Sequence, residues 1–161
     1  MSRTPSQTSP PPARIYILDD EVVTVQRLVQ ALSKDGHLVE GFITGREALL
    51  KVCDTPPDLI IMDIRLTDGD GIDLMQRMRA AAPEMAVILM TGYAAIDQAV
   101  EATKKGAFNY LEKPVKLQTI REAVADALVG NGEDPALRPA LRRAMRTLVQ
   151  RARDNPPPYR A

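Results

Sequence analysis

The chain has 161 residues, 45% of them hydrophobic and 26% charged, with 21 basic and 21 acidic side chains, a composition typical of one globular domain with some chain to spare. No apolar run approaches the roughly 20 residues that span a bilayer, and the N-terminus has no apolar core of a secretory signal. The single cysteine, Cys53, excludes an internal disulfide and favours a reducing, cytoplasmic location.

The chain alternates between strand-like and helix-like segments. Residues 1–13, rich in Ser, Thr and Pro, predict a disordered arm. Beyond them, short apolar runs typical of strands alternate with apolar side chains at helical spacing. Thr44 and Asp70 are predicted helix N-caps. The predicted strands are IYIL (15–18), LVEGF (38–42), DLIIMDI (58–64), AVILM (86–90) and AFNYL (107–111), and the helical spacing covers 25–32, 48–53, 74–82, 96–103 and 117–128.

Five such strand–helix units predict a parallel sheet with right-handed crossovers and helices on both faces, a doubly wound α/β domain. The first, third and fourth runs are almost continuously apolar, which is typical of strands covered on both faces. Ligands of such sheets bind outside the carboxyl ends of the strands. The residues that follow each predicted strand are therefore the candidates for a functional site.

Polar side chains of complementary chemistry follow four of the five predicted strands. Asp19 and Asp20 follow the first, Asp63 the third, Thr91 the fourth and Lys113 the fifth. Three carboxylates repel one another without a counter-charge, and hard oxygen ligands suit Mg²⁺. A magnesium ion keeps open positions for phosphate oxygens, and Lys113 and Thr91 offer further contacts to a phosphoryl group.

Asp63 is the predicted nucleophile of this set, because it stands alone between the acid pair and the Thr91–Lys113 side. An aspartate that attacks a phosphoryl donor forms an acyl phosphate. The chain has no glycine-rich P-loop, so the predicted site is not a nucleotide cradle of that kind.

Four stretches carry a family resemblance: LDDE (18–21), MDIRLTDGDGIDL (62–74), ILMTGYA (88–94) and GAFNYLEKP (106–114). In order and spacing, residues 14–129 resemble the receiver domain of a two-component response regulator, most of all the nitrogen-regulation type. The resemblance implies a five-stranded, flavodoxin-like sheet of strand order 2-1-3-4-5.

The resemblance also implies roles for the site residues. Asp63 would be phosphorylated by a histidine kinase or a phosphotransfer protein, and the protein would assist its own phosphorylation and dephosphorylation without being an enzyme. Thr91 and Tyr110 would act as switch residues, and a cis Lys113–Pro114 bond would aim Lys113 at the site. The implied Mg²⁺ ligands are Asp20, Asp63 and the backbone carbonyl of Arg65, with Asp19 acting through water.

One loop departs from the family pattern. Many members carry a proline near its first glycine, whereas this chain has Thr67, which we expect to loosen the loop. Asp68 and Asp70 are interpreted as turn and cap residues, and Glu21 as a residue that opens the first helix.

The last 31 residues contain seven basic and three acidic side chains. Residues 130–136 predict a linker, 137–153 a basic amphipathic helix and 154–161 a flexible tail. The helix could pack on its own domain or a twin chain, bind a partner, or contact nucleic acid or a membrane surface through its arginines. One short helix is not a helix-turn-helix, so we do not expect a sequence-specific nucleic-acid partner.

The predicted function is therefore a phosphorylation-controlled receiver. Its helix 4–strand 5–helix 5 face would dimerise or bind a downstream partner that the sequence does not specify. Two alternatives remain: the receiver fragment of a DNA-binding transcriptional regulator, and a small aspartate-nucleophile phosphohydrolase. The second is disfavoured, because that chemistry needs an Asp-x-Asp motif after the first strand and the chain has adjacent Asp19 and Asp20.

Overall fold

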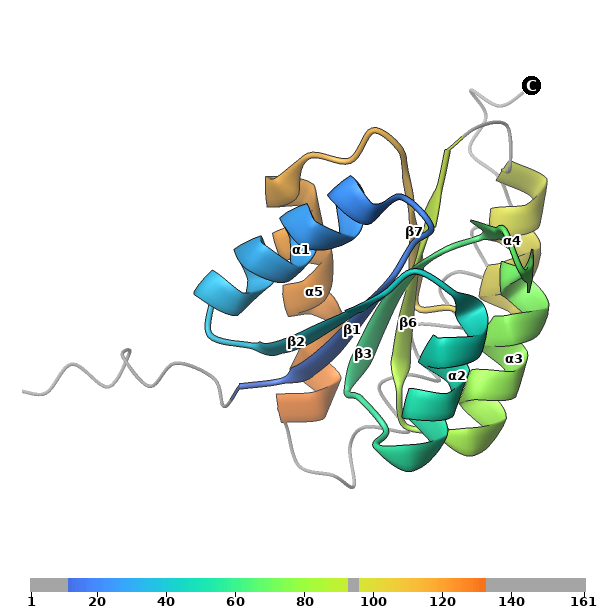
Figure 1. Ribbon diagram of the computed structural model, residues 1–161, viewed down its shortest axis with the longest axis horizontal. Coiled ribbons are helices and arrows are strands. Elements are labelled where there is room, and N and C mark those ends of the chain that lie inside the picture. The colour runs from blue at the N-terminus through green and yellow to red at the C-terminus, as the bar shows by residue number, and fades with distance from the viewer. Residues whose placement is uncertain (1–11, 93–95, 133–161) are drawn as a thin grey trace, which may run out of the picture.

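The computed structural model describes residues 12–92 and 96–132, which contain a five-stranded parallel sheet (Figure 1). The spatial order β2-β1-β3-β6-β7 confirms the predicted 2-1-3-4-5 order. Predictions for the arm, apart from Pro12 and Ala13, and for residues 133–161 lie outside the described residues. The strands are β1 (Arg14–Leu18), β2 (Leu38–Phe42), β3 (Leu59–Asp63), β6 (Ala86–Thr91) and β7 (Asn109–Glu112).

Two layers of helices cover the sheet (Figure 1). The helices α1 (Val22–Lys34) and α5 (Leu117–Gly132) lie on one face, and α2 (Gly45–Asp54), α3 (Gly71–Ala81) and α4 (Ile96–Lys104) lie on the other. Because α5 continues to Gly132, the first residues of the predicted linker are helical. Among the described residues there is no helix with the length and apolar character that a bilayer crossing requires.

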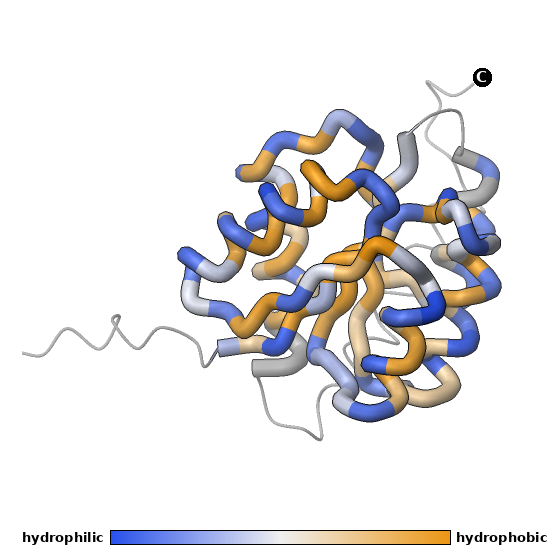
Figure 2. Tube along the Cα trace, in the orientation of Figure 1, coloured by the Kyte–Doolittle hydropathy of each residue, from blue (hydrophilic) through white to orange (hydrophobic). Residues whose placement is uncertain are grey.

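Alternate side chains of the central strands form two separate cores. Tyr16 and Ile60 pack beneath α2, α3 and α4, whereas Ile15 and Ile61 pack beneath α1 and α5. All five residues of β3 and all six of β6 are buried, which confirms the prediction of strands covered on both faces. Figure 2 shows this as a hydrophobic centre with polar outer helix faces. Each fully buried aliphatic side chain contributes on the order of 1.5–3 kcal/mol, so the cores hold the strand ends in place.

The predicted helix caps are present. Thr44 accepts a hydrogen bond from Glu47 N at 3.3 Å, and Asp70 accepts one from Ile72 N at 3.0 Å. Cys53, the last residue of the predicted helical spacing at 48–53, is exposed on α2 and does not belong to its apolar side.

A short antiparallel hairpin lies directly after β3, where the sequence predicts a loop. It consists of β4 (Arg65–Leu66) and β5 (Gly69–Asp70) and leads into α3. The backbone N–H of Gly71 donates to Ile64 O at 2.8 Å and closes the segment onto the end of β3. The hairpin therefore lies at the carboxyl edge of the sheet.

Candidate functional site

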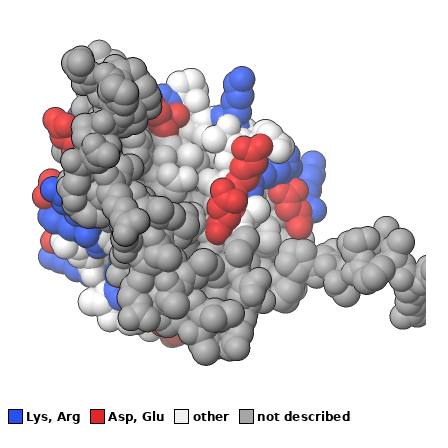
Figure 3. Space-filling model, turned by 180° about the vertical axis from the view of Figure 1, so that it is seen from behind, with Lys and Arg blue, Asp and Glu red and all other residues white. Residues whose placement is uncertain are grey.

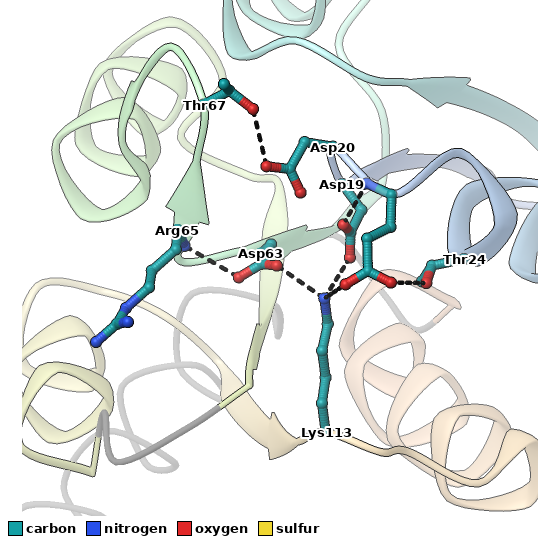
Figure 4. Close-up of polar contacts among 8 residues, drawn as sticks. Asp19, Asp20, Thr24, Asp63, Arg65, Thr67 and Lys113 are labelled. Atoms are coloured by element: carbon teal, nitrogen blue, oxygen red, sulfur yellow. Dashed lines mark hydrogen bonds and ion pairs between the residues drawn. The ribbon is translucent and has the colours of Figure 1, made fainter.

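The predicted site residues follow neighbouring strands at one edge of the sheet (Figure 4). Asp19 follows β1, Asp63 ends β3, and β1 and β3 pair in parallel. Thr91 ends β6, and Lys113 follows β7, which pairs with β6. Parallel pairing brings the carboxyl ends of these strands together. The structure thus brings together residues from four separate parts of the chain.

Asp19, Asp20 and Asp63 form one cluster of acids. Each offers a carboxylate oxygen within 4.8 Å of the others. Asp19 is completely buried and Asp63 is 7% exposed, whereas Asp20 is exposed. Three convergent carboxylate oxygens, one of them open to solvent, fit a hard divalent cation such as Mg²⁺ that retains some of its water.

Backbone N–H groups orient two of these carboxylates. Glu21 N donates to Asp19 Oδ1 at 2.9 Å, and Arg65 N donates to Asp63 Oδ1 at 3.0 Å. The hydrogen bond of Arg65 places its backbone N–H beside Asp63, and the binding of a cation by its carbonyl stays a prediction.

Lys113 is the counter-charge of the cluster. Its Nζ lies 2.7 Å from Asp19 Oδ2 and 2.8 Å from Asp63 Oδ2. Burial alone would lower the pKa of Lys113, but its hydrogen bonds to Asp19 and Asp63 outweigh that effect and raise the pKa above its ordinary value. The ammonium group is therefore charged, and the two acids share it. The Lys113–Pro114 bond is cis, as predicted.

Burial dominates the electrostatics of Asp19. It raises the pKa of this carboxyl, and the hydrogen bonds from Lys113 and from the backbone of Glu21 oppose the rise. An acid in this position gains from any additional cation, because burial penalises its charged form.

Thr91 lies beside the acid cluster, whereas Tyr110 lies apart from it. Thr91 is 5% exposed, and its carbonyl accepts a hydrogen bond from Lys113 N at 2.7 Å, so the two residues are adjacent. Tyr110 lies on β7, half-buried, and packs against the core beneath α2, α3 and α4. No hydrogen bond or ion pair joins Tyr110 to the acids among the described residues.

Glu21 contributes to the site beyond its predicted role of opening α1. It occupies the N-cap position without a side-chain cap bond, and its Oε1 lies 3.8 Å from Lys113 Nζ. Its other oxygen accepts a hydrogen bond from Thr24 Oγ1 at 3.4 Å. The third consecutive acid of the LDDE stretch was the signal that could have indicated this contact.

Thr67 is the second residue that the sequence did not assign to the site. Its Oγ1 donates a hydrogen bond to Asp20 Oδ2 at 2.8 Å (Figure 4). Asp68, next to it, accepts hydrogen bonds from the backbone N–H of Gly45 and Arg46, at 3.0 and 3.1 Å. The expected loosening of this loop is therefore contradicted, because both residues tie it to the rest of the domain.

A hollow of about 400 Å³ adjoins the cluster between α1 and the segment after β7. Its lining includes Glu21, Arg27, Lys113 and Val115. Arg27 donates to Val115 O at 2.9 Å and closes one side. The hollow therefore reaches Glu21 and Lys113, whereas Asp19, Asp20 and Asp63 do not line it.

The sequence profile of the family described as "Response regulator receiver domain" matches residues 15–125. The chain is 40% identical over 115 residues to the regulatory protein AtoC of Escherichia coli (strain K12), which covers 71% of this chain and 25% of that protein. The chain thus spans about a quarter of that relative.

Two solved structures are similar to this fold. A response regulator receiver domain protein from Clostridium thermocellum gives a TM-score of 0.69 at 33% identity, covering 72% of this chain and 94% of that one. The beryllofluoride-activated NtrC4 receiver domain dimer gives 0.68 at 32% identity, covering 71% and 94%.

Proposed function

The chain belongs to the family of response regulator receiver domains, and on this premise we propose that it accepts a phosphoryl group on Asp63 from a histidine kinase or a phosphotransfer protein. Members of this family are signalling domains of two-component systems and not catalytic enzymes. Receiver domains take phosphoryl groups from histidine kinases.

The position of Asp63 carries this proposal. One of its oxygens lies 2.8 Å from the Lys113 ammonium, and a carboxylate oxygen of Asp63 lies within 4.8 Å of ligand atoms of both Asp19 and Asp20. Asp19 also contacts Lys113, but its side chain has no exposed surface, whereas 10% of the Asp63 side chain is exposed, so Asp63 is the acid that both contacts the counter-charge and is open to an approaching donor. A phosphoryl group bound there would be next to Lys113.

Asp20 and Asp63 would hold Mg²⁺ together with the backbone carbonyl of Arg65, and Asp19 would act through water. Receiver domains bind Mg²⁺ at such an acidic cluster, and the three carboxylates found here fit that ion. When bound, Mg²⁺ neutralises part of the charge on the phosphoryl oxygens during transfer.

The transfer itself is a displacement at phosphorus. A carboxylate oxygen of Asp63 forms a bond to phosphorus while the bond from phosphorus to the donor histidine nitrogen breaks, and the nitrogen keeps that electron pair. The product is an acyl phosphate on Asp63. Lys113 remains as a charged donor to the phosphoryl oxygens, because its pKa is raised in this environment. Hydrolysis of the acyl phosphate in the same site would return Asp63 to the free carboxylate.

Mass spectrometry after incubation with acetyl phosphate and Mg²⁺ tests the proposal. We expect a Mg²⁺-dependent phosphoryl adduct on the wild-type chain and none on Asp63→Asn. Asp126→Asn, which alters an exposed acid on α5, is the matched control and should still be phosphorylated. An adduct on Asp63→Asn equal to that of the wild type would exclude Asp63 as the acceptor.

Phosphorylation would then act through a change in the population of two conformations. Thr91 lies beside the acid cluster and Tyr110 lies on β7, and we propose that these two residues couple the site to the face formed by α4, β7 and α5. We propose dimerisation through this face, since the similar NtrC4 receiver is an activated dimer. Light scattering with and without beryllofluoride tests this, and an unchanged monomer mass would contradict it.

The output of the switch is a separate proposal. Because the chain spans about a quarter of AtoC, it could act alone or as the receiver part of a longer regulator. In the parts of Figure 3 where described residues are visible, acidic and basic side chains both occur, and we propose a protein partner. We propose that the phosphoryl transfer from the kinase to Asp63 takes place in the cytoplasm.

A further inference from the structure

Thr67 reaches the acid cluster from the hairpin after β3. Its Oγ1 donates a hydrogen bond to Asp20 Oδ2 at 2.8 Å, across 47 positions of the sequence (Figure 4). The contact depends on the hydroxyl group of Thr67, because a side chain without a polar hydrogen could not donate it.

The hairpin that carries Thr67 is held firmly. The strands β4 and β5 pair through Arg65 with Asp70 and through Leu66 with Gly69. Asp68, the residue after Thr67, accepts hydrogen bonds from the backbone N–H groups of Gly45 and Arg46 at the start of α2. Thr67 thus projects from a segment that is anchored on both sides.

Asp20 is the acid that most needs such an anchor. Asp19 and Asp63 each accept a backbone hydrogen bond and an ion pair from Lys113. Asp20 is exposed, and within residues 12–92 and 96–132 Thr67 is the residue that donates a side-chain hydrogen bond to it. Without Thr67 the Asp20 side chain would sample other rotamers, and a cation would have to order it on binding.

The chemistry of the hydroxyl suits this task. Thr67 uses one carboxylate oxygen of Asp20, and the other points toward Asp19 and Asp63 (Figure 4). A neutral donor orients the carboxylate without cancelling its charge, in contrast to the Lys113 ammonium. Hydrogen-bonded outer partners of this kind fix the orientation of ligating carboxylates and raise metal affinity.

We propose that Thr67 is a positioning residue for Mg²⁺: its hydroxyl presets the orientation of Asp20. This inference rests on the proposed function, in which the acid cluster holds Mg²⁺.

Isothermal titration with MgCl₂ at constant ionic strength tests the inference. Thr67→Val removes the hydroxyl at nearly constant shape, and we expect it to weaken Mg²⁺ binding about tenfold, the lower end of the range for outer-shell partners. Thr67→Ser keeps the hydroxyl and should keep most of the affinity. Thermal unfolding of each variant in EDTA shows whether the metal-free fold is intact, and Thr67→Ala replaces Thr67→Val in the titration if the valine variant does not fold.

Three results separate the possible failures. Equal affinities of the wild type and Thr67→Val would overturn the role of Thr67. An equal loss in Thr67→Val and Thr67→Ser would also overturn it, because packing of the hairpin and not the hydroxyl would then be responsible. A wild type that binds no more Mg²⁺ than Asp20→Asn would instead remove the proposed metal site, and the inference with it.

Discussion

The ammonium nitrogen of Lys113 lies 2.7 Å from Asp19 Oδ2, and the Asp19 side chain has no exposed surface. Without Lys113, the Asp19 carboxylate would remain buried with no cationic partner among the described residues. An isolated buried charge is strongly unfavourable, so the pair affects folding as well as phosphate binding.

Replacing Lys113 by Met should therefore destabilise the metal-free protein. We expect the free energy of unfolding to fall by about 2 kcal/mol, less than for a fully buried pair because the Lys113 side chain is 18% exposed. Urea unfolding in EDTA measures the loss. Lys105→Met, which breaks an exposed helix pair with Glu101, is the control and should cost no more than about 0.5 kcal/mol. In an Asp19→Asn background the effect of Lys113→Met should shrink, and an undiminished loss there would refute this account.

Mg²⁺ should stabilise the fold through the three acids. A ligand that binds only the folded state at ten times its dissociation constant adds about 1.4 kcal/mol to the free energy of unfolding. We expect this gain for the wild type, its reversal by EDTA, and its loss in Asp20→Asn. The exposed Asp126→Asn variant should keep the gain. Equal stabilisation of Asp20→Asn and the wild type would place the ion elsewhere.

Local patterns predicted the parallel sheet and the central part of the site, whereas the strand order was implied by the family resemblance. Asp63 and Lys113 could be expected to meet, since both lie at the ends of strands in a parallel sheet. In the structure, Lys113 Nζ lies 2.8 Å from Asp63 Oδ2. The boundaries were less accurate: Asn109 begins β7 two residues later than predicted, because Ala107 N bonds to Ala102 O in the turn that ends α4.

The contacts of Thr67 and Asp68 could not be predicted. They join the hairpin to Asp20 and to Gly45, which lie 47 and 23 positions away. No periodicity encodes such contacts, because they depend on how the hairpin folds back over the edge of the sheet. For the same reason a threonine in place of a proline indicated a looser loop, whereas its hydroxyl forms a new bond.

Asp68 should stabilise the start of α2 in a pH-dependent way. Its carboxylate oxygens accept hydrogen bonds from the backbone N–H groups of Gly45 and Arg46. These two groups lie in the first turn of α2 and have no hydrogen-bond partner within the helix. These hydrogen bonds lower the pKa of Asp68 below its ordinary value of 3.8. Because the folded state holds the proton less tightly, the stabilisation is present above 3.8 and is lost as the pH falls through the lowered pKa.

The free energy of unfolding of the wild type and of Asp68→Ala, measured between about pH 7 and pH 2, tests this predicted direction of the pH dependence. We expect a difference of about 1 kcal/mol at neutral pH, as for a helix cap, and a smaller difference at the acid end. Arg46, Asp70, Asp73 and Arg77 line a second hollow together with Asp68, and both proteins contain these four residues. If the difference in the free energy of unfolding between the wild type and Asp68→Ala grew on acidification, the stabilising role of the Asp68 carboxylate would be contradicted.

Gly71 should be the glycine whose replacement most disturbs the site. A Cβ atom there would lie 2.4 Å from Ile64 O and 2.8 Å from Asp63 O, both backbone atoms that cannot rotate away. Gly71→Ala must therefore move α3 off the end of β3, break the 2.8 Å bond from Gly71 N to Ile64 O and displace Asp63. We expect a loss of about 3 kcal/mol in the free energy of unfolding, together with weaker Mg²⁺ binding.

Gly45→Ala is the matched control, because its nearest obstacle is the side-chain atom Leu74 Cδ2 at 2.7 Å. A leucine can change rotamer, so the cost should be about 1 kcal/mol. Urea unfolding and Mg²⁺ titration of both variants compare the two positions. If Gly45→Ala proved the more damaging, or if Gly71→Ala bound Mg²⁺ like the wild type, the close approach of α3 to β3 would not be what positions Asp63.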